Sequence, residues 1–306
     1  MFDSIWKDIK YKAETGTMVT KLVIANVAVF LLIKLVWIGI VVATGSTDAA
    51  GQYYDIFIDW IALAGSPLYT LTHIWVIITH MFVHEGFLHI LFNMLFLYWF
   101  GNILGDMIGD KKILPLYILG GLMGALFYML SFNLLTAWGI GSPALGASAA
   151  VMGIVISAAM VAPEYEMRLL FLGDVKLKWI ALAAIVLDLV QATPGATNSG
   201  GHIAHLGGAF MGYLFISNLQ KGKDFSIPVN NFFKSVTGFF DKKKLKVAYK
   251  NPKGSTLKRN QKAHAVSDQR ETAQDKLDAI LDKIKLKGYD SLTKAEKDFL
   301  AEESKK

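Results

Sequence analysis

The stretch GSPALGASAAVMGIVISAAMVA, residues 141–162, decides how this chain is interpreted. It is almost wholly apolar, and ten of its residues between 146 and 162 are Gly, Ala or Ser, so a helix here can approach its neighbours closely. Ser148 stands just inside the expected start of that helix. Its hydroxyl is either a packing group that bonds its own backbone or a nucleophile, and the segment alone favours packing. The positions of the other polar residues in the chain decide between the two.

The composition is typical of a membrane protein. Hydrophobic residues make up 53% of the chain, the mean hydropathy is +0.40 and only 18% of residues are charged. The absence of cysteine excludes disulfides, thiolate metal sites and a cysteine nucleophile. The N-terminal residues lack the pattern of a signal peptide, so we expect the first apolar stretch to remain in the protein.

Six apolar stretches are predicted to cross a bilayer as helices. They are residues 20–43, 87–105, 113–135, 146–162, 177–193 and 201–219. Lys and Arg are found in alternate connecting segments, which under the positive-inside rule places both termini in the cytoplasm. Residues 71–83 are apolar but short for a crossing. We interpret them, together with residues 53–63, as part of a loop in the outer interface, with His73 and His80 unrelated to chemistry.

Charge separates a membrane part from a basic tail. Residues 1–220 hold 10 Lys and Arg against 13 Asp and Glu, whereas residues 221–306 hold 21 against 12, a net charge of +9. Such a tail predicts contact with anionic lipid, and because no binding motif accompanies its lysines, nucleic acid is not expected as a partner.

The predicted divisions follow from these patterns. They are a cytoplasmic N-terminal tail (1–19), a membrane domain (20–219), a basic linker (220–270) and a C-terminal helical hairpin (271–306). In the hairpin, Thr293 and Glu296 match a capping box that opens the last helix.

Polar residues gather at one end of alternate predicted helices. The second, fourth and sixth helices begin at the outer face, and each has an unusual polar residue in its first two turns. These residues are His89 and Asn93, Ser148, and His202 and His205. At about 1.5 Å per residue, all lie within roughly 10 Å of the outer boundary.

Stripes of small residues predict that the fourth and sixth helices pack together. The stripes are Ala149, Gly153 and Ser157 on one helix, and Ala204, Gly208 and Gly212 on the other. This packing would bring Ser148 within reach of His205, and imidazole is the base suited to activating a serine at neutral pH. His89 and Asn93 can supply N–H donors to an oxyanion.

Three motifs together resemble the rhomboid family of intramembrane serine proteases. They are HILFN (89–93), GASA (146–149) and AHLGGAFMG (204–212), and the similarity extends over roughly residues 83–219. The resemblance implies an all-α polytopic membrane protein with a six-helix rhomboid-like bundle and a catalytic Ser148/His205 dyad. It implies that His89, Asn93 and the Ser148 backbone N–H hold the oxyanion. It also implies supporting roles for His84, Gly146, Met152, Gly208 and Gly212.

The function implied by the resemblance is cleavage of the transmembrane segments of membrane proteins near the outer leaflet. We therefore expect transmembrane substrates, neither metal nor cofactor, and a location in the plasma membrane of a prokaryote. The sequence departs from the family pattern at two positions. Ala149 follows the serine where the family usually has glycine, and Met152 replaces an aromatic residue, and we expect both to be tolerated. His205 is preferred to His202 as the base because small residues follow it three and seven positions later, as in the family.

Several alternatives were compared with this interpretation. A zinc protease is disfavoured because His84 and His89, five residues apart, point about 140° away from each other on a helix. An aspartyl protease needs two facing aspartates, and Asp188 is alone within a predicted helix. A transporter site would lie near the midplane between broken helices, which are not predicted. The serious alternative is an inactive relative that binds and escorts membrane-protein clients.

Two charges lie away from the ends of the predicted helices. For Lys34 we favour snorkelling to the interface, and for Asp188 a hydrogen bond inside the bundle, over a direct chemical role.

Overall fold

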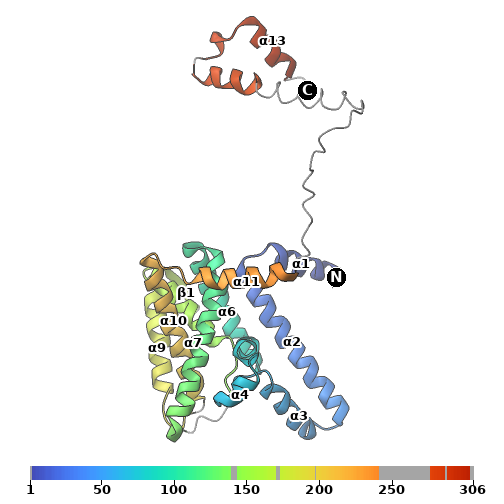
Figure 1. Cartoon of the computed structure of the whole chain (residues 1–306), viewed down its shortest axis with the longest axis vertical. Helices are drawn as coiled ribbons and strands as arrows, with labels where there is room; N and C mark the ends of the chain where they lie inside the picture. Colours follow the sequence, from blue (N-terminus) through green and yellow to red (C-terminus); the bar gives the residue numbers. More distant parts are fainter. Residues whose placement is uncertain are drawn as a thin grey trace, which may run out of the picture. The chain divides into compact units, whose positions relative to one another are not determined.

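The computed structural model describes residues 2–138, 143–169, 173–196, 198–240, 276–286 and 288–303. It divides the chain into two compact units, Met1–Lys242 and Lys243–Lys306. The first unit is a helical bundle (Figure 1). Its long helices are α2 (Met18–Thr44), α6 (Phe87–Ile108), α7 (Ile113–Leu134), α8 (Ser148–Val161), α9 (Leu177–Gln191) and α10 (Ser199–Gln220). Each coincides with one of the predicted crossing segments.

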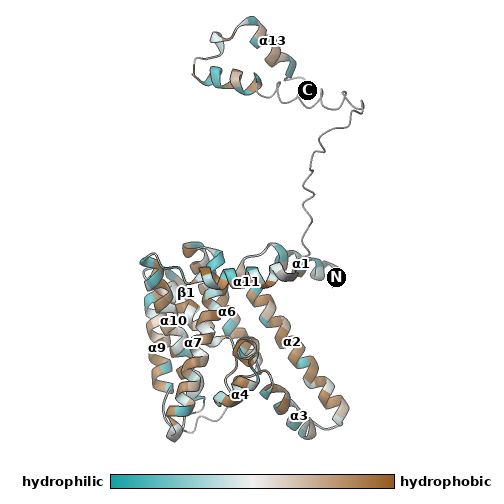
Figure 2. Cartoon of the chain, in the orientation of Figure 1, coloured by the Kyte–Doolittle hydropathy of each residue, from teal (hydrophilic) through white to brown (hydrophobic). Residues whose placement is uncertain are grey.

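Three helical stretches among the described residues are long and apolar enough to cross a membrane. They are Met18–Thr44, Phe87–Ile108 and Asp110–Leu134, while Ser148–Val161 is a shorter apolar helix. Figure 2 shows apolar residues along most of α2, α7 and α9, and more hydrophilic residues in α1 (Phe2–Thr15). The prediction of a helical membrane protein is therefore confirmed, and the count of six crossings stays a prediction.

Short helices connect α2 to α6. They are α3 (Thr47–Asp59), α4 (Pro67–Thr72), α5 (Val76–Thr79) and the 3₁₀ turn η1 (His80–Phe82). Because α4 ends at Thr72 and the chain turns before α5 and again at η1, residues 71–83 form no crossing helix, as predicted. The side chain of His80 in this segment is buried inside the protein, and the location of the loop at the membrane interface stays a prediction.

This connecting segment is joined to the bundle by hydrogen bonds. Leu63 and Ala144 exchange two backbone bonds of 2.9 Å, and the hydroxyl of Tyr117 on α7 donates to the Met81 carbonyl at 2.8 Å. The ammonium group of Lys34 on α2 donates to the carbonyl of Glu85 at 2.6 Å. The Lys34 ammonium group, for which snorkelling to the interface was favoured, is therefore bound by a backbone carbonyl of the loop.

The centre of the bundle is formed by α7, α8 and α10. Every α8 residue from 149 to 159 except Met152 is buried. Gly120 of α7 lies so close to α8 that an added Cβ would stand 3.3 Å from the Cα of Ala150. Small residues on these helices therefore replace the side-chain layer that normally separates packed helices.

The loop after α8 contains strands, which the all-α prediction did not include. β1 (Glu166–Leu169) and β2 (Gly173–Lys176) form an antiparallel pair, with Glu166 opposite Lys176. Before the pair, Glu164 binds Lys176 at 2.7 Å and also contacts Lys178, and these bonds lower the pKa of Glu164 to about 2.

Part of the predicted basic linker is helical. α11 (Ser226–Phe240) lies beside the turn between α6 and α7, where Asn230 donates to the Lys111 carbonyl at 3.1 Å and Lys112 pairs with Asp224 at 3.6 Å. The predicted basic linker thus contains a helix before residue 241, and the rest of it, residues 241–270, is outside the described residues.

The second unit contains the predicted small helices. Residues 276–286 are helical, and η4 (Tyr289–Ser291) and α13 (Lys294–Glu303) follow a turn at Gly288. The capping box is confirmed, because the Thr293 N–H donates to Glu296 at 2.7 Å and the Glu296 N–H donates to the Thr293 hydroxyl at 3.4 Å. Lys283 reaches the same glutamate at 2.8 Å. Residues 271–275 and 304–306 of the predicted hairpin are outside the described residues.

Candidate active site

Ser148 is the first residue of α8, and a braced loop holds it there. The N–H of Gly146 donates to the His80 carbonyl at 2.8 Å, and the N–H of Ala147 donates to the Nε2 atom of His84 at 3.3 Å. Gly146 has φ +113°, a conformation that disfavours side chains, and a Cβ there would stand 2.7 Å from Nε2 of His89. Glycine is therefore needed at 146 both for the turn and for the imidazole beside it.

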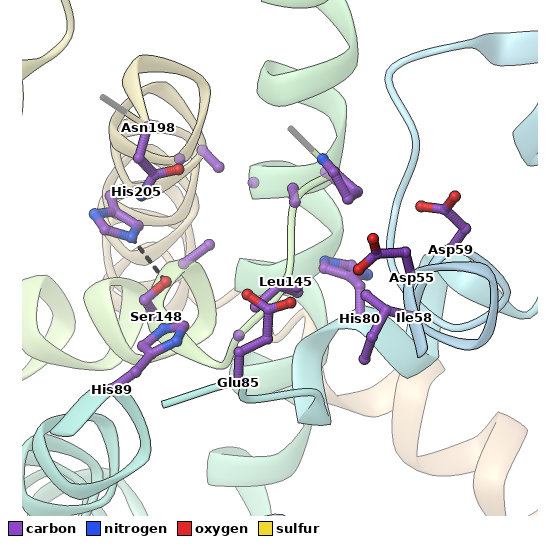
Figure 3. Close-up of a pocket in the computed structure, with 18 residues that line it drawn as sticks. Asp55, Ile58, Asp59, His80, Glu85, His89, Leu145, Ser148, Asn198 and His205 are labelled. Carbon is purple, nitrogen blue, oxygen red and sulfur yellow. Dashed lines mark hydrogen bonds between the residues drawn. The ribbon is translucent and has the colours of Figure 1, made fainter. Parts of the chain in front are cut away.

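His205 of α10 faces that serine. Its Nε2 atom lies 2.7 Å from the Ser148 Oγ, as the dashed line in Figure 3 marks. The other ring nitrogen, Nδ1, lies 2.9 Å from Oδ1 of Asp188. A carboxylate oxygen accepts, so Nδ1 carries a proton and Nε2 is free to accept the proton of the serine. This is the arrangement of a nucleophile and its general base.

The close packing of α8 and α10 brings these two residues together. A Cβ on Gly208 would stand 2.7 Å from the carbonyl carbon of Ala149, and one on Gly212 would stand 3.0 Å from that of Gly153. One turn further along, the hydroxyl of Ser157 donates to the Gly212 carbonyl at 3.2 Å. The packing predicted from the two stripes is confirmed.

The methyl group of Ala149 has a matching space on α7. A Cβ on Gly124 would lie only 2.5 Å from the Cβ of Ala149, which is itself 7% exposed. Gly124 thus leaves room for the methyl that departs from the family pattern, and α8 keeps its close contact with α10.

The proposed oxyanion donors lie on the other side of the serine. Figure 3 shows the His89 ring beside Ser148, and a second pocket includes both His89 and Asn93. The Asn93 amide donates to the His89 carbonyl at 2.9 Å, which uses one of its two N–H bonds and leaves the other. Met152 lines the same pocket as His205.

His84 braces the loop instead of facing the dyad. It is fully buried, and its Nδ1 lies 3.2 Å from the Phe82 carbonyl while its Nε2 accepts from Ala147. Burial and, to a smaller extent, the neighbouring His89 lower the pKa of His84 to about 4. A neutral imidazole can therefore accept the Ala147 bond at physiological pH.

Two cavities meet at the serine. One, of about 620 Å³, has Ser148 and His205 on one side and Asp55, Asp59 and Glu85 on another (Figure 3). The other, of about 390 Å³, is lined by apolar side chains of α6 and α8 and by Ala184 of α9. The same hydroxyl is thus reached from a polar side and from an apolar side.

The hydrogen bonding of Asp188 inside the bundle is confirmed, but sequence reasoning missed its partners. Its Oδ1 atom accepts from Nδ1 of His205 and also from Nδ1 of His202, at 2.9 and 2.8 Å. Among the described residues, these three side chains also form a group whose potential ligand atoms lie within 4.8 Å of one another. The two N–H···O bonds account for that spacing. One signal in the sequence could have indicated these contacts. Asp188 and the two histidines all lie in the outer halves of their predicted helices.

Comparisons with known proteins show which sequences this chain resembles. Residues 71–221 match the rhomboid domain, and residues 263–306 match a family of unknown function, DUF6576. RHOMBOID-like protein 12, mitochondrial, of Arabidopsis thaliana is 32% identical over 158 residues, which are 48% of this chain and 47% of that protein. Rhomboid protein 1, mitochondrial, of Saccharomyces cerevisiae is 32% identical over 139 residues, or 45% and 40%. Presenilin-associated rhomboid-like protein A, mitochondrial, of Danio rerio is 31% identical over 137 residues, or 44% and 35%.

The comparisons also correct one expectation. The chain spans less than half the length of each of these relatives. All three are named as mitochondrial proteins, which contradicts the prediction of a prokaryotic plasma membrane with cytoplasmic termini. That prediction used the charge of loops, a pattern that reports sidedness and not the identity of the membrane.

Proposed function

Because this chain belongs to the rhomboid family, we propose that it is an intramembrane serine endopeptidase that acts on membrane proteins. The observation that carries the proposal is the 2.7 Å contact between Ser148 Oγ and His205 Nε2, on a cavity of about 620 Å³ at the start of α8. The reaction is hydrolysis of a peptide bond in or beside a transmembrane segment. A helical segment must unwind locally to present that bond, because a helix holds its carbonyls in hydrogen bonds.

Acylation begins at the serine. His205 takes the Ser148 proton as Oγ attacks the carbonyl carbon, and the carbonyl oxygen becomes an oxyanion. Donors to that oxygen are the Ser148 backbone N–H, free at the start of α8, the His89 ring and the remaining Asn93 N–H. His205 then gives its proton to the leaving amine, and the peptide bond breaks.

Deacylation uses the same residues in the same order. Water reaches the acyl-serine through the polar cavity, and His205 takes a proton from it as the water attacks. Collapse of the second oxyanion returns the proton to Ser148 and releases the carboxylic acid. Each bond to the serine that forms in the first half is thus broken in the second.

The tail supports a location at a bilayer surface. α11 exposes Ile227, Phe232 and Val236, with fractions of 56%, 64% and 41%, in a part of the chain whose net charge is +9. Apolar side chains inserted at the interface, together with basic residues near anionic headgroups, give additive membrane binding. We assign α11 and the basic residues after it to contact with anionic lipid.

The test is reaction of the purified full chain in detergent with a fluorophosphonate that labels activated serines. We expect labelling of the wild type and none of Ser148→Ala or His205→Ala, with all three proteins melting at similar temperatures. Cleavage of a model transmembrane substrate should follow the same pattern. A folded wild type that is never labelled would overturn the proposal and favour a module that binds membrane-protein clients without cutting them.

A further inference from the structure

Asp188 has a side chain whose hydrogen bonds all go to one neighbouring helix. It lies on α9, is 5% exposed, and its Oδ1 accepts from Nδ1 of His202 and Nδ1 of His205. Its other oxygen, Oδ2, is buried and has no hydrogen-bond partner among the described residues. The described contacts therefore give this carboxylate no role except toward the two histidines.

The shared oxygen fixes which nitrogen of each ring carries the proton. Because a carboxylate oxygen only accepts, both Nδ1 atoms must donate, which leaves Nε2 of His205 with its lone pair. That lone pair faces the Ser148 hydroxyl at 2.7 Å. In the other tautomer, the Nδ1 lone pair would face the buried carboxylate and lose that bond, and Nε2 would donate its proton to the serine oxygen, so the ring could no longer accept the serine proton.

His202 and His205 differ in what lies beyond the carboxylate. They are three residues apart on α10, their ring centroids are 5.6 Å apart, and both bind the same oxygen. Only His205 reaches Ser148. His202 therefore holds Asp188 in place without touching the nucleophile, and it provides a natural control for the effect of removing one N–H donor.

We propose that Asp188 is a positioning residue for the reaction, acting through His205 in an Asp188–His205–Ser148 relay that joins α9, α10 and α8. The inference rests on the proposed function for its consequence in catalysis. The carboxylate holds His205 in the tautomer that accepts the serine proton, and it stabilises the imidazolium formed when that proton is transferred. The carboxylate itself stays unprotonated throughout, so the proton passes only between Ser148, His205 and the leaving amine.

Asp188→Asn is the variant that tests the relay, because it keeps the size of the side chain and removes its charge. An amide can place either N–H or C=O toward His205, so the tautomer is no longer fixed. We expect the rate of fluorophosphonate labelling and the kcat for a transmembrane substrate to fall about 100-fold or more, with KM unchanged. His202→Ala, which leaves the His205 bond intact, should lower both by less than about tenfold.

Histidine ¹⁵N NMR of the full chain in detergent gives a readout that does not need activity. His205→Gln identifies the His205 signals. Wild-type His205 should show the Nδ1–H tautomer, and Asp188→Asn should shift it to a mixture of the two. An Nε2–H tautomer in the wild type would overturn the inference even if Asp188→Asn failed to fold.

The outcomes separate this inference from the proposed function. Suppose that the wild type is labelled, that Asp188→Asn is labelled equally fast and that the tautomer is unchanged. This result would contradict the relay but not the proposed protease activity. Suppose instead that the wild type is never labelled but that the His205 tautomer depends on Asp188. This result would contradict the proposed protease activity but not the effect of Asp188 on His205. Loss of activity in Asp188→Asn that only matches a loss of folded protein, with the tautomer retained, would reduce Asp188 to a structural residue and contradict the proposal.

Discussion

α2 and α7 are both long apolar helices, but they occupy opposite environments. Only 6% of the most apolar window of α2 is buried inside the protein, against 56% of that of Asp110–Leu134, which contains α7. The two differ in their glycines. Gly39 of α2 has no atom within 4 Å of an added Cβ, whereas Gly120 and Gly124 of α7 lie directly against α8. Apolar composition thus indicates entry into the membrane, and closely packed small residues indicate which helices form the centre.

The largest effect is expected from a substitution at the close contact between α8 and α10. Gly208→Leu places a side chain against the Ala149 backbone, while Gly39→Leu adds the same side chain to the open surface of α2. We expect Gly208→Leu to lose more than about 3 kcal/mol of unfolding free energy, together with all labelling of Ser148. The measurement is the yield of monodisperse protein and its thermal unfolding in detergent.

Gly39→Leu should match the wild type in both measurements. Equal stability of the two leucine variants would show that the α8–α10 contact does not govern the fold.

A smaller effect is expected where α7 meets α8. Gly124→Ala brings two methyl groups to about the 2.5 Å separation that an added Cβ would have from Ala149, so we expect a loss of about 1–3 kcal/mol in unfolding free energy. Ala149→Gly should restore most of it in the double variant, which a double-mutant cycle of thermal unfolding measures. If the free-energy changes of the two single variants simply add in the double variant, the Ala149 methyl does not contact position 124.

The smallest effect is expected in the loop that connects α2 to α6, which contains His84. The pKa of buried His84 is about 4 in the folded protein, against a usual 6.5. The unfolded chain therefore binds the extra proton first, so the stability from this group is complete above about pH 6.5 and is lost as the pH falls towards 4. Between about pH 7 and about pH 5 the loss is up to about 2 kcal/mol.

His84→Gln should flatten this dependence, because glutamine does not titrate. Thermal unfolding at the two pH values, for wild type and variant, checks it. His80, whose pKa burial also lowers to about 4, supplies the remaining slope. An unchanged slope in His84→Gln would show that His84 is accessible to protons in the folded state.

The helices and their central contact could be predicted from the sequence because both leave local patterns. Apolar length gives the helices, and small residues at four-residue spacing give the faces of α8 and α10 that touch. The stripe also placed Ser148 and His205 at one end of adjacent helices, which the 2.7 Å contact between them reproduces.

Asp188 could not be placed in the same way. α9 is apolar on several sides, because exposed Leu182 and Leu187 lie about 140° apart around the helix and buried Ala181 lies on a third side, so its periodicity does not say which side faces the bundle. The carboxylate is 14 and 17 residues from its partners, beyond the reach of any local rule. α11 was missed for another reason, since its lysine-rich surroundings resemble a solvated linker.

The space at Gly124 limits the order in which this sequence can have arisen. With glycine at 149, a methyl at position 124 would meet no methyl on α8, although it would still stand 3.0 Å from the Ala204 carbonyl oxygen. With alanine at 149, only glycine at 124 leaves room. The methyl beside the serine is therefore acquired at least cost on a background that already has Gly124, and once present it makes alanine at 124 destabilising. Two positions 25 residues apart in the chain thus constrain which side chain each can carry.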